Sequence, residues 1–152
     1  MSVIVKQIVK GRIDIQALKT VFEMAGQRVQ APGLVTVHNS ASGTHQIPVS
    51  LHIPPEVLIA LGLRQGRRTE YGLGLHEFEN GEVEAVYDAF YASPDMRGFV
   101  PKLGNLSKVA GLKGSPVNML YDRQEDKLLV QVAAAGTKPG SNAFMPPSHG
   151  KA

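Results

Sequence analysis

The sequence predicts an α+β fold built mostly of antiparallel β-hairpins, with one amphipathic helix over about residues 14–25 and one or two short helical turns. Short β-branched or alternating apolar segments recur along the chain, separated by Gly, Pro and Asn, which is typical of strands joined by turns. One further segment repeats apolar residues at helical spacing. The chain has 152 residues, of which 43% are hydrophobic and 19% charged. This size and composition fit one packed domain and exclude a chain disordered throughout.

The first two elements are a strand and the amphipathic helix. Residues 3–9 are rich in Val and Ile and precede Gly11, which predicts a strand. Asp14 can cap the helix that follows, and Gly26 ends it. The apolar stripe of this helix consists of Ile15, Leu18, Val21, Phe22 and Ala25.

A hairpin and a short helix follow. Residues 34–38 alternate, residues 39–44 are a polar loop, and residues 46–53 are extended again, which predicts a hairpin over 34–53. Pro54-Pro55 then precedes a short helical run over 56–61, because proline is tolerated in a first helical turn. Gly62 supplies the stop.

The second half of the chain predicts two more hairpins. Asn80-Gly81 is the strongest turn signal and joins an extended segment at 67–78 to residues 82–91, whose pattern fits a strand or a helix; the turn favours the strand. Residues 93–105 are punctuated by Pro and Gly and are predicted to be loop. We expect a helical turn over 106–110 and a hairpin formed by 117–121 and 127–133.

The domain organisation follows from a change in composition near residue 134. Residues 1–133 are predicted to form a single globular domain, and 134–152 a flexible, basic tail rich in Gly and Pro. Apolar runs are far shorter than the roughly 20 residues that cross a bilayer, and the N-terminal segment lacks signal-peptide features. Without cysteine, disulfides and thiolate zinc sites are excluded. We therefore expect a cytoplasmic protein that does not bind membranes.

The net charge of +3 is unevenly distributed. Residues 1–68 and 96–152 each hold eight Lys or Arg against three Asp or Glu, a net charge of +5, whereas residues 69–95 hold seven acidic residues and no Lys or Arg. The basic blocks are candidates to face an anion such as nucleic acid, or to pair with the acidic block within the fold or between subunits. The acidic segment 70–95 is a candidate contact for a transcription or replication protein.

A weak internal repeat marks the middle of the chain. Residues 61–69 (LGLRQGRRT) are echoed about 49 positions later by residues 110–117 (AGLKGSPV), and both precede a predicted hairpin. Such a unit needs a second copy or another chain to bury its apolar face.

The longer stretch over residues 53–71 (IPPEVLIALGLRQGRRTEY), followed by 79–83 (ENGEV), resembles the AbrB/SpoVT-type swapped-hairpin DNA-binding proteins. The resemblance covers residues 46–85, with a faint echo at 106–132. It implies an intertwined oligomer, a dimer or higher, in which two chains interlock their hairpins and present arginines to duplex DNA. The family's basic positions are occupied here by Leu51, His52, Leu58 and Ile59, so the resemblance implies a fold element and an oligomer more than duplex readout.

Cations beside aromatic residues indicate nucleic-acid binding. Residues 96–121 hold four cations and no acid, and an exposed aromatic ring near them would stack on a base. Alternatively these rings are core, as we expect for Phe90 and for one of Tyr87 and Tyr91. The candidate nucleic-acid-binding residues are Arg64, Arg67, Arg68, Arg97, Phe99, Lys102, Lys108, Lys113, Tyr87, Tyr91 and Lys138.

Motifs for catalysis or metal binding are not found in the sequence. It holds no nucleophile elbow, phosphate loop, dinucleotide fingerprint or zinc-protease motif, so we predict a protein that is not an enzyme and has no cofactor. His38, His45 and His52 are spaced by seven, which along strands puts His45 on the opposite face from the other two, so we predict no metal site. The carboxylates of 77–88 lack calcium-loop spacing and are read as a solvated strand face.

The leading functional hypothesis is a non-enzymatic, oligomeric DNA-binding protein that favours single-stranded or locally melted DNA and acts as a transcription or replication accessory factor. No recognition helix accompanies the basic loop, and a duplex reader would be expected to have one. Two alternatives remain open at this point: an AbrB-like duplex-binding transcriptional regulator, and an oligomeric structural or assembly protein.

Overall fold

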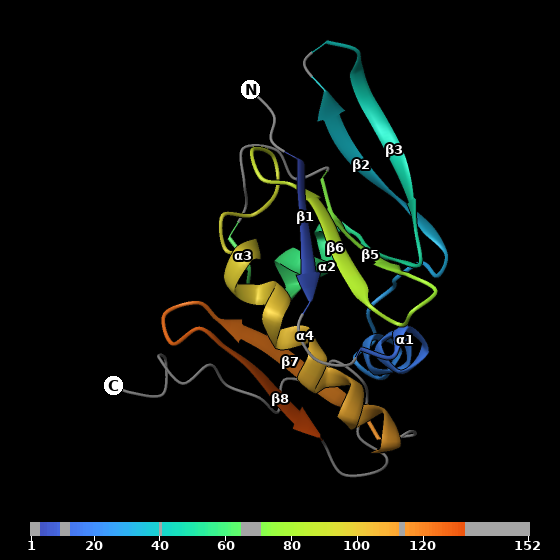
Figure 1. Ribbon diagram of the computed structural model, residues 1–152. Helices are drawn as coiled ribbons and strands as arrows, with labels where there is room; N and C mark the ends of the chain where they lie inside the picture. Colours follow the sequence, from blue (N-terminus) through green and yellow to red (C-terminus); the bar gives the residue numbers. More distant parts are fainter. Residues whose placement is uncertain (1–3, 10–12, 40, 65–70, 113–114, 133–152) are drawn as a thin grey trace.

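The computed structural model describes residues 4–9, 13–39, 41–64, 71–112 and 115–132, and shows an α+β fold with mostly antiparallel strands and few helices, as the sequence predicts (Figure 1). Its centre is a four-stranded antiparallel sheet in the order β1-β6-β5-β4. These strands are β1 (Ile4–Val9), β4 (Leu51–Ile53), β5 (Leu73–Glu77) and β6 (Val83–Asp88). The predicted turn at Asn80-Gly81 joins β5 to β6, and Gly81 has a φ of 89° that favours glycine.

The amphipathic helix is confirmed as α1 (Ile15–Met24). Asp14 caps it, because its Oδ1 accepts a hydrogen bond from the backbone N–H of Ala17 at 3.1 Å. Leu18, Val21 and Phe22 are fully buried in the main core, which also holds the inward side chains of the sheet. The helix therefore buries its apolar side in the core that it shares with the sheet.

The hairpin β2 (Gly33–Asn39) and β3 (Gly43–Val49) extends beyond the sheet (Figure 1). The prediction of a single hairpin over 34–53 is partly wrong, since the chain leaves β3 and enters the central sheet as β4, which pairs with β5. Val35 and Val49 pack on Val86 to form a second, smaller core on the other face of the sheet. The short helix α2 (Pro55–Ala60) then forms where expected.

The prediction of a loop over 93–105 is wrong. The chain there winds through α3 (Met96–Phe99), the 3-10 turn η1 (Val100–Lys102), α4 (Leu103–Leu106) and the 3-10 turn η2 (Ser107–Leu112). An apolar stripe at helical spacing outweighs the Pro and Gly residues, because the whole stripe is buried in the main core. It consists of Met96, Phe99, Val100, Leu103 and Leu106.

The last predicted hairpin is confirmed as β7 (Val117–Asp122) and β8 (Lys127–Val132). It joins the turn after α2, where the backbone N–H of Tyr121 donates to the carbonyl of Leu61 at 2.6 Å. Strands β4, β5 and β6 pair with one another within one chain, and the AbrB/SpoVT resemblance stays a prediction. Interlocking with a second chain stays a prediction, and the tail over 134–152 lies outside the described residues. No helix among the described residues is long and apolar enough to span a membrane.

Gly74 lets the β2–β3 hairpin approach the sheet. A Cβ at Gly74 would lie 2.7 Å from Cγ1 of Val49 and 2.9 Å from Cγ1 of Val35. We expect Gly74→Ala to lower the free energy of unfolding by about 1–3 kcal/mol through overpacking, measured by urea denaturation. Gly111→Ala is the matched control, since a Cβ there meets nothing within 4 Å. Equal denaturation midpoints for the two variants would show that the hairpin does not pack as described.

Candidate nucleic-acid interface

Three segments meet at one end of the helical stretch over 96–112. The turn after α2 ends at Arg64, Asp95 directly precedes α3, and the β7–β8 turn spans residues 123–126. The hydrogen bond from Tyr121 to Leu61 ties the hairpin to the first of these segments. Cationic side chains that are far apart in the sequence are thereby brought close to one carboxylate.

Asp95 anchors the guanidinium of Arg64. Nη2 of Arg64 donates to Oδ1 of Asp95 at 2.8 Å, Nε donates to both carboxylate oxygens at 3.0 and 3.1 Å, and the backbone N–H of Arg64 donates to Oδ2 at 2.9 Å. The Asp95 side chain is 7% exposed, whereas that of Arg64 is 51% exposed. The guanidinium is thus fixed on its inner edge and open to solvent on its outer edge, a geometry suited to a phosphate.

The pKa of Asp95 reflects this arrangement. Burial alone would raise it, but the hydrogen bonds and charge of Arg64, together with the charge of Arg123, outweigh burial and lower the pKa below its usual value. The same pairing raises the pKa of Arg64. Asp95 is therefore a carboxylate at neutral pH and compensates one positive charge.

Arg97 and Arg123 complete what we call the arginine cluster, defined as Arg64, Arg97 and Arg123. Arg123 is exposed on the β7–β8 turn and lies near enough to Asp95 to lower its pKa. Arg97 is exposed on α3, two residues after Asp95. Arg64 and Arg123 thus share a single buried carboxylate, and Arg97 adds a third exposed cation to the segment that follows it.

Lys102 lies beside this cluster but is already paired. Its Nζ lies 3.2 Å from Oδ2 of Asp126, whose Oδ1 accepts a 2.6 Å hydrogen bond from the hydroxyl of Tyr121. The Tyr121 hydrogen bond and then Lys102 lower the pKa of Asp126. Gly98 allows this contact, because a Cβ there would lie 2.7 Å from the Tyr121 hydroxyl oxygen. These groups fasten the hairpin turn to the helical stretch.

The local charge is mixed. Asp122 ends β7 and Glu125 lies on the β7–β8 turn, where Oδ1 of Asp122 accepts the backbone N–H groups of Gln124 and Glu125. Attraction for a phosphate therefore depends on the outward edges of the arginines more than on net charge.

Two aromatic candidates are corrected. Phe99 is 0% exposed and Tyr87 is 3% exposed, so neither ring can stack on a base. Both rings lie in the main core, which is the alternative that the sequence left open for Tyr87. The hydroxyl of Tyr87 donates to Oε1 of Gln7 at 3.3 Å. Burial raises the pKa of Tyr87 despite the opposing charge of Arg97.

Tyr91 is partly buried and belongs to an aromatic group. Its ring stacks on Tyr71 at 4.7 Å between centroids and meets Phe90 and His38 edge-on at 4.9 and 5.4 Å. Phe90, which we expected in the core, is also only partly buried. Tyr91 therefore remains the aromatic candidate with accessible surface.

The other candidates are not gathered at this site. Lys108 is exposed on η2, farther along the helical stretch. Arg67, Arg68, Lys113 and Lys138 lie outside the described residues. Arg123 was missed because the sequence places it among three acidic residues, and only the packing of the hairpin turn brings it near Asp95.

The three spaced histidines have different neighbours. His45 Nε2 lies 2.6 Å from Oγ of Ser42, and His52 Nδ1 lies 3.0 Å from Oε1 of Gln30. Burial lowers the pKa of His52, against the charge of Glu56. Among the described residues, no group of three or more His, Cys, Asp or Glu could hold a metal ion.

Comparison of the chain with protein families, with curated proteins and with solved structures found no match.

Proposed function

We propose that the protein is a non-enzymatic nucleic-acid-binding protein that favours single-stranded or locally melted DNA and serves transcription or replication. The observation that carries the proposal is the arginine cluster, in which the exposed Arg64 and Arg123 act on one buried carboxylate and the exposed Arg97 lies on α3, two residues after it. Arg64 is held in place before any ligand arrives, which lowers the entropy lost on binding a phosphate. The chain continues from Arg64 into Arg67 and Arg68, two further cations.

The described helices favour a single strand over a duplex groove. The outward face of α1 carries Gln16, Lys19 and Glu23, so it presents no row of cations. The helices over 96–112 are single turns with their apolar side in the core. A single strand needs only phosphate contacts and a stacking surface, for which Tyr91 is the candidate.

The β2–β3 hairpin is a ribbon of the kind that can enter a major groove, but it lacks cations. The sequence has no Lys or Arg between Arg28 and Arg64. Without phosphate contacts along the ribbon, sequence-specific duplex binding of the AbrB type is less well supported than single-strand binding.

The test is a fluorescence anisotropy titration of the full chain with a 20-nucleotide single strand, its duplex and the matching RNA, each at 50 and 200 mM salt. We expect the tightest binding to single-stranded DNA. Three phosphate contacts predict that raising the salt lowers this affinity by about 15-fold or more. Affinity for the duplex equal to or above that for the single strand, or affinity that does not change with salt, would refute the proposal.

A pair of double variants assigns binding to the arginine cluster. We expect Arg97→Ala combined with Arg123→Ala to weaken single-strand binding by about 10- to 25-fold at 0.1 M salt, because two phosphate contacts are lost. Lys19→Ala combined with Arg28→Ala removes the same charge from α1 and the segment after it, and should leave affinity nearly unchanged. Equal losses in the two variants would show that net charge, and not this site, holds the strand.

A further inference from the structure

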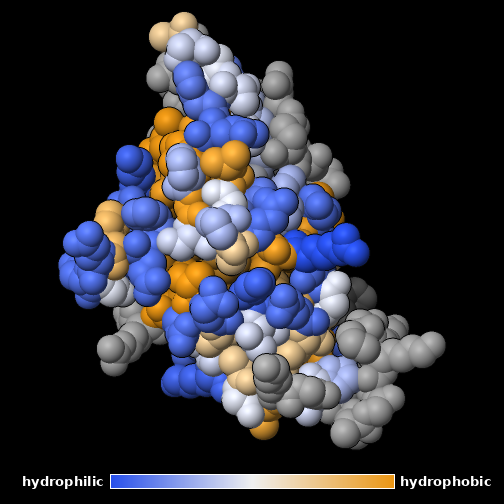
Figure 2. Space-filling model, turned by 90° about the vertical axis from the view of Figure 1, so that its right-hand side faces the viewer, coloured by the Kyte–Doolittle hydropathy of each residue, from blue (hydrophilic) through white to orange (hydrophobic). Residues whose placement is uncertain are grey.

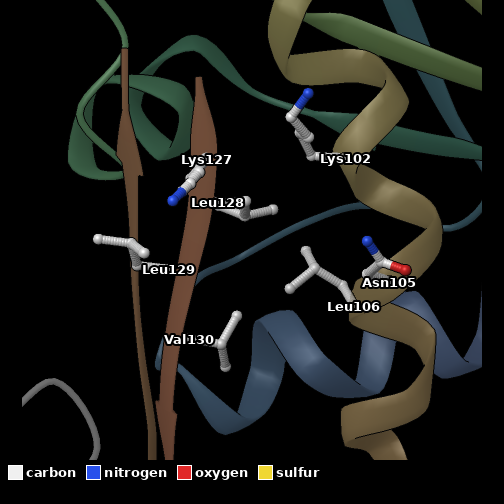
Figure 3. A pocket seen from close by; sticks show the side chains of 7 residues that line it. All are labelled: Lys102, Asn105, Leu106, Lys127, Leu128, Leu129 and Val130. Carbon is white, nitrogen blue, oxygen red and sulfur yellow. The ribbon is translucent and has the colours of Figure 1, made fainter. Parts of the chain in front are cut away.

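Two surfaces outside the arginine cluster complement each other. The first is the basic groove, which lies between β8 and residues 102–106 and has a volume of about 260 Å³. Leu106, Leu128 and Val130 form its apolar wall, and Lys102 and Lys127 lie toward one end of it on opposite walls, with their ammonium groups pointing away from each other (Figure 3). An apolar channel with cations at its end suits an apolar side chain flanked by carboxylates.

The second surface is the acidic tip, which we define as Ile8 and the β5–β6 turn residues Phe78, Glu79, Glu82 and Glu84. Phe78 is 38% exposed and Ile8 is 45% exposed. The turn is held by hydrogen bonds from Phe78 N–H to the carbonyl of Glu82 at 2.8 Å and from Glu82 N–H to Oδ1 of Asn80 at 2.9 Å. On the side of the molecule that carries this turn, apolar patches are bordered by hydrophilic residues (Figure 2).

We propose that the protein assembles head to tail, with the acidic tip of one copy seated in the basic groove of the next. Phe78 would enter the apolar channel, and Glu79 and Glu82 would meet the lysines. Lys127 is the cation available for this, because it forms no ion pair within the described part of the chain, whereas Lys102 already holds Asp126.

The positions of the two surfaces require a second copy. The β5–β6 turn projects away from β8 and α4, so this turn does not reach the groove of its own chain (Figure 1). Because the surfaces differ, the contact is heterologous and repeats into a ring or an open chain. This assembly is independent of nucleic acid and goes beyond the proposed function.

The test is charge reversal followed by sedimentation velocity over a range of protein concentrations, without nucleic acid. The apparent mass of the wild-type protein should rise above the 16.3 kDa of one chain as the protein concentration increases, and this rise should be smaller at high salt. Lys127→Glu and Glu82→Lys, both at exposed positions, should each sediment as one chain. An equimolar mixture of the two variants, and the chain carrying both changes, should associate again, because the opposite charges face each other once more.

Three results would overturn the proposal: wild type that stays at the mass of one chain, single variants that associate like wild type, or a mixture that does not restore association. Circular dichroism confirms that each variant is folded. The Arg97→Ala, Arg123→Ala double variant should assemble normally, since it changes neither surface. Failure of assembly with intact DNA binding, or the reverse, therefore separates this inference from the proposed function.

Discussion

Replacing Phe99 with alanine is expected to lower the free energy of unfolding by about 3–5 kcal/mol. The ring is fully buried where the helical stretch over 96–112 meets β7, and it packs edge-on against Tyr121 at 5.6 Å between centroids. Truncation removes this contact and leaves a cavity in the main core. If Phe99 instead stacked on a nucleic-acid base, as the sequence predicted, Phe99→Ala would weaken DNA binding and change the free energy of unfolding very little.

Urea denaturation, with a single-strand titration of the folded variant, distinguishes the two roles. Phe99→Leu should lose clearly less stability than Phe99→Ala, because it preserves most of the apolar volume. Phe78→Ala is the control, since that ring is 38% exposed and its loss should change stability little. A stable Phe99→Ala protein with weakened DNA affinity would reverse our assignment of Phe99 to the core.

Arg64→Ala is expected to lower the free energy of unfolding, because it breaks an ion pair whose carboxylate is buried although the Arg64 side chain is half exposed. The change removes the side-chain donors of Asp95, whose side chain is 7% exposed, and leaves only the backbone N–H of Arg64 to bind it. In a double-mutant cycle with Asp95→Asn, the losses should be clearly non-additive, because both changes break the same contact. Additive losses would show that Arg64 and Asp95 act separately.

The same variant has a predicted pH dependence. Because Arg64 lowers the pKa of Asp95 in the folded wild type, the stability from this pair is present above the unfolded value of about 3.9 and is lost as pH falls through the folded pKa. In the Arg64→Ala variant, Asp95 stays buried without this partner, so we expect its pKa to be higher than in wild type. Protonation of Asp95 then removes the buried, unpaired charge at a higher pH than in wild type. Denaturation at pH 7, 5 and 3 should show the difference between the two proteins narrowing as pH falls. A constant difference would contradict a charged Asp95.

The elements that the sequence predicted well are those with local signals. Asp14 caps α1 through a hydrogen bond three residues away, and the Asn80-Gly81 turn joins neighbouring strands. Both depend on residues close in the chain, so periodicity and turn chemistry suffice.

The errors arose where distant packing decides the outcome. Gly98 and Pro101 indicated a loop, yet Gly98 lies in α3. Glycine is needed there because a Cβ would come too close to the Tyr121 hydroxyl, a contact that the sequence does not reveal. Phe99 lies two residues after a cation, Arg97, and the sequence therefore predicted an exposed ring, whereas the helical turn points it into the core.

The candidate site was predictable only in part. Arg64 and Arg97 were recognisable as cations beside Gly turns, but the Asp95 carboxylate that organises them appeared only as a member of the acidic block. Arg123 reaches Asp95 through the pairing of β7 with β8 and the contact of Tyr121 with Leu61. No local pattern encodes such a long-range contact.

The most direct test of the central claim is the slope of log affinity against log salt concentration for single-stranded DNA. Each phosphate contact on a single strand contributes about 0.7 to this slope, so wild type should give a slope of about −2 or steeper from three arginines. The Arg97→Ala, Arg123→Ala double variant should reduce the magnitude of the slope by about 1.4, whereas Lys19→Ala with Arg28→Ala should leave it unchanged. A slope that is the same in all three proteins would contradict phosphate binding at the arginine cluster.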